Sequence, residues 1–166
     1  MNFKETEQLL TTVTKYLSSD KIRIQTDTCK DYLGKSYTAD YVQITNDPNN
    51  HIGIEVTENE IIIFFFTDHA HFEDYTSPIK EGETNYIQRA AEFLDKLFTL
   101  PIERNYTIKG NRIIRDESFF IIGNKKVSCA GITLSFAGFR NMFKKKKRVC
   151  EKFLFNKETA CFICVD

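Results

Sequence analysis

The sequence lacks several features that would place it in a familiar functional class. No apolar run approaches the roughly 20 residues that a transmembrane helix needs. Basic and acidic residues both number 23, so the net charge is zero, which argues against a protein that coats nucleic acid electrostatically. No complete catalytic or nucleotide-binding signature is present either. The information on function that remains in the sequence therefore lies in local clusters of side chains that could bind a partner.

Signs of export and of several domains are also missing. The N-terminus has neither the basic start nor the apolar block of a secretory signal, and the five cysteines form an odd set. Free thiols in a reducing compartment are the simplest interpretation, so we expect a cytoplasmic protein. No linker, repeat or low-complexity tract interrupts the 166 residues, of which 42% are hydrophobic. We therefore expect one globular domain over residues 1–166.

The most prominent stretch is the run of six bulky residues Ile61–Phe66. It is too short for a membrane span and suits a strand covered on both faces, which we predict to be the central strand of the fold. If Glu58–Asn59 is a two-residue turn, this strand forms a hairpin with residues 51–57 and pairs Ile54 with Ile63. The far end of the run leads directly into a cluster of acids, imidazoles and aromatic rings.

Periodicity in the rest of the chain predicts helices and antiparallel strands. In chain order these are helix 2–17, strands 21–27, 37–44, 51–57 and 60–66, helix 84–98, strands 105–108, 112–115, 118–122, 125–130 and 132–136, a candidate helix within 138–150, and strands 151–155 and 160–165. The order predicts an α+β fold, a single domain with a large, mainly antiparallel β-sheet packed against two or three α-helices.

The cluster that follows the apolar run consists of Asp68, His69, His71, Glu73, Asp74 and Tyr75. In extended geometry His69, His71 and Glu73 share one face because side chains alternate along a strand. Two imidazoles and a carboxylate suit zinc or another divalent cation, and they also suit general acid and base catalysis. Alternatively the histidines end a strand, with Tyr75 in the core and the acids in solvent.

A third interpretation treats the same six residues as a recognition surface. Acids around amphipathic rings suit a basic partner, because charge speeds encounter while rings supply buried area. Charge along the chain is consistent with this interpretation. The segment Glu55–Lys96 has ten acids against three basic residues, a net of −7, and Lys109–Lys157 has thirteen basic residues against three acids, a net of +10. If the two segments form separate faces, the acidic one attracts a cationic partner and the basic one an anionic partner. Alternatively, the two segments face each other or are simply solvated.

The apolar strand that runs into Phe-Thr-Asp-His-Ala-His-Phe-Glu-Asp-Tyr, followed by an amphipathic helix, resembles small bacterial immunity proteins of polymorphic toxin and contact-dependent growth inhibition systems. The resemblance covers residues 52–98, and the C-terminal hairpins match no family pattern. It implies a cytoplasmic inhibitor that binds a cognate toxin domain with a basic face, often a nuclease, and covers its active site. On this view the six cluster residues bind the partner, and we expect no enzymatic activity, metal, cofactor or membrane contact.

Two other functions compete with the inhibitor. A metal-dependent hydrolase would use His69 and His71, together with His51, which the predicted hairpin places opposite Phe66. A nucleic-acid-binding protein would use the basic run Lys144–Arg148 to contact phosphates, although a single charge run is usually a solvated face.

A half zinc-knuckle spacing occurs near the C-terminus at Cys161 and Cys164. No second Cys-x-x-Cys pair accompanies it, and a strand there would point the two thiols to opposite faces. We therefore expect a structural role for these cysteines.

Overall fold

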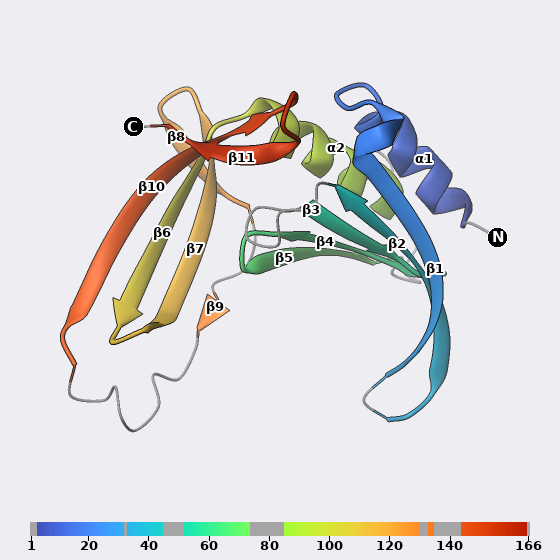
Figure 1. The fold of residues 1–166 in the computed structure, drawn as a ribbon, viewed down its shortest axis with the longest axis horizontal. Helices are drawn as coiled ribbons and strands as arrows, with labels where there is room; N and C mark the ends of the chain where they lie inside the picture. Colours follow the sequence, from blue (N-terminus) through green and yellow to red (C-terminus); the bar gives the residue numbers. More distant parts are fainter. Residues whose placement is uncertain are drawn as a thin grey trace.

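The computed structural model describes residues 3–31, 33–44, 52–73, 85–129, 133–134 and 144–165, and it confirms the α+β fold. Its strands form two antiparallel sheets (Figure 1) instead of the one large sheet predicted. The first sheet, in the order β1-β2-β3-β4-β5, contains β1 (Ile22–Lys30), β2 (Ser36–Ile44), β3 (Ile52–Val56), β4 (Glu60–Phe65) and β5 (Asp68–Glu73). The second, in the order β11-β10-β6-β7-β8 with β9 paired to β7, contains β6 (Ile102–Lys109), β7 (Arg112–Ile122), β8 (Lys125–Ser128), β9 (Thr133–Leu134), β10 (Lys146–Asn156) and β11 (Cys161–Cys164).

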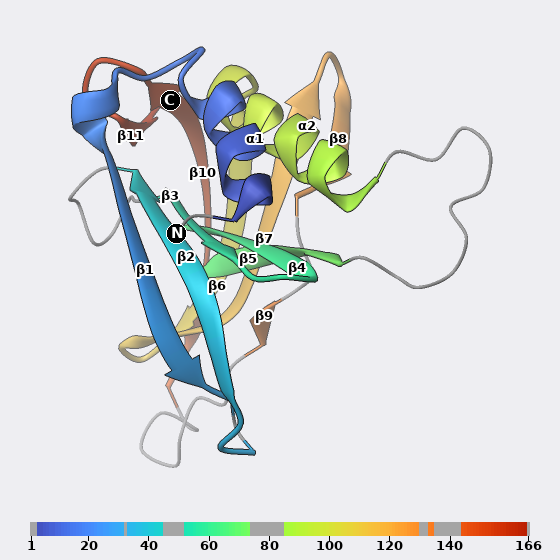
Figure 2. The ribbon, with the colours of Figure 1, turned by 90° about the vertical axis from the view of Figure 1, so that its right-hand side faces the viewer.

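Two α-helices, α1 (Lys4–Val13) and α2 (Tyr86–Thr99), lie on one side of the first sheet (Figure 2), and a 3₁₀ turn spans Ser19–Lys21. Helix α2 contacts α1, β4, β5 and β10, so it joins the two sheets. Its predicted apolar stripe is confirmed, because Ala90, Leu94, Leu97 and Phe98 are buried. No helix in the described part of the chain is long and apolar enough to cross a membrane.

The start of α1 depends on a contact with a distant residue, whereas the start of α2 has a local cap. Helix α1 ends at Val13, four residues earlier than predicted, and no side chain caps its N-cap residue Phe3. Instead Asp40 of β2 accepts a hydrogen bond from the Phe3 amide at 2.7 Å. Helix α2 is capped by Asn85, whose side chain accepts from the Gln88 amide at 2.8 Å. The first residues of the two predicted helices, Asn2 and Thr84, lie outside the described residues.

One hydrophobic core joins both sheets, and it includes Ile54 and Phe65 of the first sheet and Phe120 and Phe153 of the second. The predicted register of β3 and β4 is confirmed, with Ile54 opposite Ile63. Burial along β4 alternates, however, so only one face of that strand is fully covered. The prediction that the apolar run is covered on both faces is therefore wrong, because the described helices cover a single side of this sheet. The run is also not the central strand, since β3 holds that position in the order of the sheet.

The second sheet corrects two further predictions. The separate strands predicted at 112–115 and 118–122 are one strand, β7. The helix predicted within 138–150 is wrong for the described part, because β10 begins at Lys146 and pairs with β6 as far as Lys109. Hydrogen bonds to β6 take the place of helical ones along this basic segment, and tertiary pairing thus overrides its local helical pattern. The turn that we expect between the strands at 105–108 and 112–115, Lys109–Asn111, is shorter by one residue, because Lys109 still pairs with Arg112. The turn expected at Gly123–Asn124 is confirmed.

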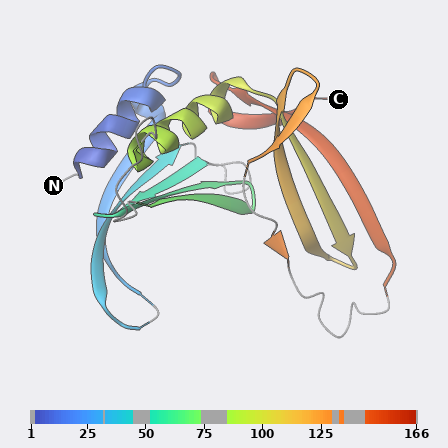
Figure 3. The ribbon, with the colours of Figure 1, turned by 180° about the vertical axis from the view of Figure 1, so that it is seen from behind.

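Long hairpins extend on both sides of β3, β4 and β5. Residues Ser36–Ala39 of β2 pair with β1 but have no partner in β3, so the β1–β2 hairpin projects beyond the first sheet. Strands β6, β7 and β10 extend on the opposite side (Figures 1 and 3). The face of β3–β5 that points away from the helices, here called the outer face, therefore lies between two projecting arms.

Candidate functional site

The β4–β5 hairpin turns at Phe66 and Thr67, and the second sheet holds this turn in place. Phe66 has φ 52°, in the left-handed region that residues other than glycine rarely adopt. The centroid of its ring lies 4.5 Å from that of Phe162 and 4.9 Å from that of Phe153. These aromatic contacts offset the cost of the backbone conformation and fix the turn against the second sheet.

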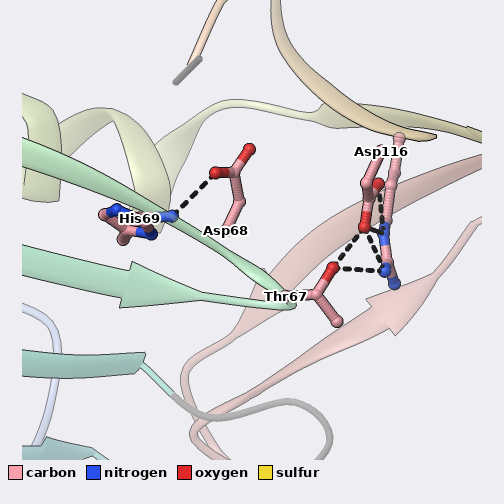
Figure 4. A network of polar contacts seen from close by, with 5 residues as sticks. Thr67, Asp68, His69 and Asp116 are labelled. Atoms are coloured by element: carbon pink, nitrogen blue, oxygen red, sulfur yellow. Dashed lines mark hydrogen bonds and ion pairs between the residues drawn. The ribbon is translucent and has the colours of Figure 1, made fainter. Parts of the chain in front are cut away.

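A partly buried polar network secures the same turn (Figure 4). Arg104 donates from Nε to both carboxylate oxygens of Asp116, at 3.0 and 3.1 Å, and from Nη2 to Oδ2 at 2.6 Å. Arg104 also donates from Nη2 to the hydroxyl of Thr67 at 3.0 Å, and that hydroxyl donates to Asp116. The side chains of Arg104 and Asp116 are 12% and 2% exposed. A charge-assisted network of this kind makes the hairpin a rigid support for the strand that follows.

Asp68 is the first of the six predicted site residues, and the prediction that it is displayed to a partner is wrong. It is 6% exposed and lies opposite the buried Phe65 in the pair that closes the hairpin. Its Oδ1 accepts a hydrogen bond from the amide of His69 at 2.9 Å (Figure 4). The two-residue turn directs Asp68 toward the core side of the sheet, because side chains directly opposite each other share one face.

The predicted grouping of His69, His71 and Glu73 on one face is confirmed by the alternation along β5. Both histidines are exposed, and the centroids of their rings lie 4.8 Å apart. The remaining site residues Asp74 and Tyr75, and the candidate third histidine His51, lie outside the described residues. The outer face of β5 therefore presents two imidazoles and one carboxylate side by side.

Glu60 of β4 completes this group, and the sequence interpretation missed it. It lies directly opposite Glu73, and its Oε1 is 2.5 Å from Nδ1 of His71. Ligand atoms of Glu60, His71 and Glu73 all lie within 4.8 Å of one another. The turn that creates this contact consists of Phe66 and Thr67, which carry no glycine or asparagine signal. Glu60 could have been identified from the sequence only if β4 and β5 had been predicted to pair across a turn at Phe66 and Thr67.

Strand β5 ends the first sheet, and its backbone is partly available. In a two-residue hairpin the closing pair exchanges backbone hydrogen bonds and the following pairs alternate, so the amides and carbonyls of His69, His71 and Glu73 point away from β4. The amide of His69 is satisfied by Asp68, and the carbonyl of Glu73 accepts from Arg89 at 3.2 Å. No described residue forms a hydrogen bond with the backbone of His71 on this edge. Within the described part of the chain, the centre of β5 is therefore open to a further strand.

A hollow lies next to Glu60, at the end of the first sheet that carries the β1–β2 and β3–β4 turns. A depression of about 980 Å³ lies between the β1–β2 turn and the β3–β4 turn. Its lining includes Lys35, Tyr37, Glu55, Glu58, Glu60 and Ile62. The Tyr37 hydroxyl donates to Glu55 at 3.2 Å, and burial, reinforced by this neighbouring carboxylate, raises the pKa of Tyr37. The surface next to Glu60 is thus concave and carries charges of both signs.

A second charged surface lies on the outward face of the second sheet, which we call the basic face. The register places seven basic residues there, namely Lys109, Arg112, Arg115, Lys126, Lys146, Arg148 and Lys152. Two acids on this face are paired, Glu103 with Lys126 and Glu117 with Arg115. The predicted basic run Lys144–Arg148 is exposed and forms the start of β10.

The C-terminal cysteines occupy β11, with Cys161 half-buried and Cys164 exposed. Their odd spacing in a strand places them on opposite faces, as predicted. All five cysteines are free thiols.

No protein-family model matches this sequence, and comparison with curated proteins and with solved structures gave no significant match.

Proposed function

We propose that this chain is a cytoplasmic protein-binding inhibitor, an immunity protein that neutralises a cognate toxin domain by covering its active site. The partner docks on β5 and on the outer face beside it. The observation that carries the proposal is the position of β5 at the end of its sheet, with His69 and His71 exposed and the backbone of His71 directed outward. An edge strand with open backbone groups and specific side chains suits strand addition by a partner.

The distribution of charge favours a basic partner. Residues 52–73 contain five acids and neither lysine nor arginine. The described residues of 102–129 and 144–156 contain twelve basic residues and four acids, a net of +8. A partner with a basic substrate-binding face is attracted to β3–β5 and repelled by the projecting β6–β7–β10 arm, which orients it on the hairpin.

The fixed turn supports the same proposal. Binding costs less free energy when the docking strand is already ordered, and interfaces on rigid scaffolds change little on association. The Arg104–Asp116–Thr67 network and the ring contacts of Phe66 order the start of β5 in the free protein.

The decisive experiment uses the gene next to the one that encodes this chain. If that neighbour encodes a large secreted toxin, its C-terminal domain is expected to arrest growth when produced alone. Co-production of this chain should restore growth, and the two proteins should copurify as a stable complex. Growth arrest that persists despite soluble production of this chain contradicts the proposal.

Charge reversal then tests the docking surface. Glu73→Lys is expected to slow association with the toxin domain about tenfold at low salt, because steering by complementary charge raises association rates by factors of this order. The effect should shrink as salt is added. Glu92→Lys, an exposed position on α2, is the matched control and should leave the rate unchanged. Equal rates for the two variants exclude β5 as the docking strand.

A second candidate function rests on the basic face. Exposed cations on β7 and β10, the two strands that flank β6, suit contacts with the phosphates of nucleic acid; they include Arg112, Lys146 and Arg148. Fluorescence anisotropy with labelled duplex DNA and single-stranded RNA tests it, with Lys146→Glu and Arg148→Glu combined as the disrupting variant. Binding that weakens steeply with salt and is lost in this variant favours the second candidate.

A further inference from the structure

We infer that the β4–β5 hairpin binds a divalent transition-metal ion, with zinc the best match, through Glu60, His71 and Glu73. The inference goes beyond the proposed function, because it concerns the isolated chain and requires no toxin. It rests on the placement of one imidazole nitrogen and two carboxylates within 4.8 Å of one another on the outer face.

The cluster follows from the register of the hairpin. Glu60 and Glu73 are directly opposite, and His71 is the diagonal neighbour of Glu60 on the same face. Side chains in these positions are close enough to share one ligand. Three ligands that come from two strands joined by a short, fixed turn are held nearer together than three ligands on a loop.

The donor set selects the class of ion. Calcium and magnesium prefer oxygen ligands alone, whereas an imidazole with two carboxylates suits zinc and neighbouring transition metals. In the described part of the chain, neither Glu60 nor Glu73 forms an ion pair with a lysine or arginine, and the ion-pair partner of Glu60 is His71. Arg89 donates to the backbone carbonyl of Glu73, which leaves its carboxylate available.

Binding requires a small rearrangement of exposed side chains. Nδ1 of His71 and Oε1 of Glu60 are now 2.5 Å apart, in hydrogen-bond contact. Zinc–ligand distances of about 2.0–2.2 Å in a tetrahedral site place two ligand atoms about 3.3 Å apart. The ion therefore displaces the shared proton and separates the two atoms by less than an ångström. Rotations about the exposed side-chain bonds of these residues suffice, and the core is not disturbed.

The fourth position is open to His69 or to water. The ring of His69 lies 4.8 Å from that of His71 on the same strand face. A site with three protein ligands and one exchangeable position is also the arrangement in which zinc polarises a bound water.

Isothermal titration of the purified chain with zinc chloride tests the inference. We expect one ion per chain, no response to magnesium chloride, and affinity reduced at least about tenfold in Glu60→Gln, His71→Asn and Glu73→Gln, since even groups that only support metal ligands contribute 10- to 100-fold. Glu58→Gln, in the exposed β3–β4 turn, is the matched control and should bind like the parent chain. Circular dichroism of each variant establishes that the fold is retained.

Two outcomes would overturn the inference. In the first, Glu60→Gln and Glu73→Gln bind zinc as tightly as the parent while His69→Asn abolishes binding, which places the ion on the histidines alone. In the second, cobalt substitution gives intense thiolate charge-transfer absorption, which places the ion on exposed thiols such as Cys150 and Cys164. Weak absorption typical of nitrogen and oxygen ligands, lost in His71→Asn, supports the hairpin site.

Discussion

Arg104 and Asp116 face each other diagonally across β6 and β7, with the guanidinium group within 3.1 Å of both carboxylate oxygens and almost no solvent around the pair. The pair lies where the first sheet meets the second, because Arg104 also contacts Thr67 at the β4–β5 turn. It therefore controls the position of the candidate site without belonging to its exposed surface.

Removal of one partner of this pair should destabilise the protein strongly. We expect Arg104→Met to lower the free energy of unfolding by about 3–5 kcal/mol, because it leaves a buried carboxylate without its counter-charge. The double variant Arg104→Met with Asp116→Leu should recover much of that loss, since apolar replacement of both partners is often close to neutral. Urea denaturation of the single and double variants measures the coupling. Additive losses in the double variant would contradict this account of the junction.

Asp40 is expected to make stability depend on pH in the acid range. Its buried carboxylate accepts hydrogen bonds from Thr6 Oγ1, Thr26 Oγ1 and the Phe3 amide at 2.6 to 2.7 Å. Burial alone opposes ionisation, but these hydrogen bonds outweigh it and lower the pKa of Asp40. A depressed pKa contributes stability above the ordinary aspartate value of about 3.9, and this contribution is lost as pH falls through the folded-state value.

The variant Asp40→Asn tests this expectation. It should unfold about 1–3 kcal/mol more easily at pH 7, because the charge-assisted hydrogen bonds to the start of α1 are lost. The gap between parent and variant should begin to narrow below the ordinary aspartate value of about 3.9, where the unfolded chain takes up a proton, and should close once the folded carboxylate is protonated at its lower pKa. Thermal denaturation from pH 2 to 7 measures the gap, with the exposed Glu92→Gln as control. A gap that does not change with pH would refute the role of the Asp40 charge.

Phe66 combines a strained backbone with favourable ring contacts, so glycine and alanine should act differently there. Loss of the ring should cost about 3–5 kcal/mol in Phe66→Ala. Phe66→Gly loses the same contacts but relieves the left-handed conformation, which costs other residues about 1–2 kcal/mol. We therefore expect Phe66→Gly to be the more stable of the two by about 1 kcal/mol, the reverse of the usual order in strands. Denaturant titration of both variants decides the order.

The backbone of β5 provides a test of strand addition that is independent of its side chains. His71→Ala keeps the outward amide, whereas His71→Pro removes it without breaking a hydrogen bond to β4. If a toxin domain adds a strand to this edge, the proline variant should bind at least about tenfold more weakly than the alanine variant, since each lost interface hydrogen bond costs about 1–3 kcal/mol. Equal affinities would show that the partner contacts side chains alone.

Local sequence patterns predicted most elements but few of their neighbours. The alternation of apolar residues and the turn at Glu58–Asn59 were enough to place Ile54 opposite Ile63. The division into two sheets was not predictable in the same way, because α2 and the Phe66 ring contacts join segments far apart in the chain. The local sequence at the basic start of β10 favours a helix, and its pairing with β6 makes it a strand.

In the candidate site, too, some features are predictable from the local sequence and others are not. The grouping of His69, His71 and Glu73 on one face is predictable from the sequence, because it follows from the geometry of any strand. The burial of Asp68, the contact of Glu60 with His71 and the position of β5 at the end of its described sheet follow from the three-dimensional arrangement. Each of these outcomes depends on which segment lies alongside another, and such pairings are set by long-range packing and hydrogen bonding rather than by neighbours in the chain.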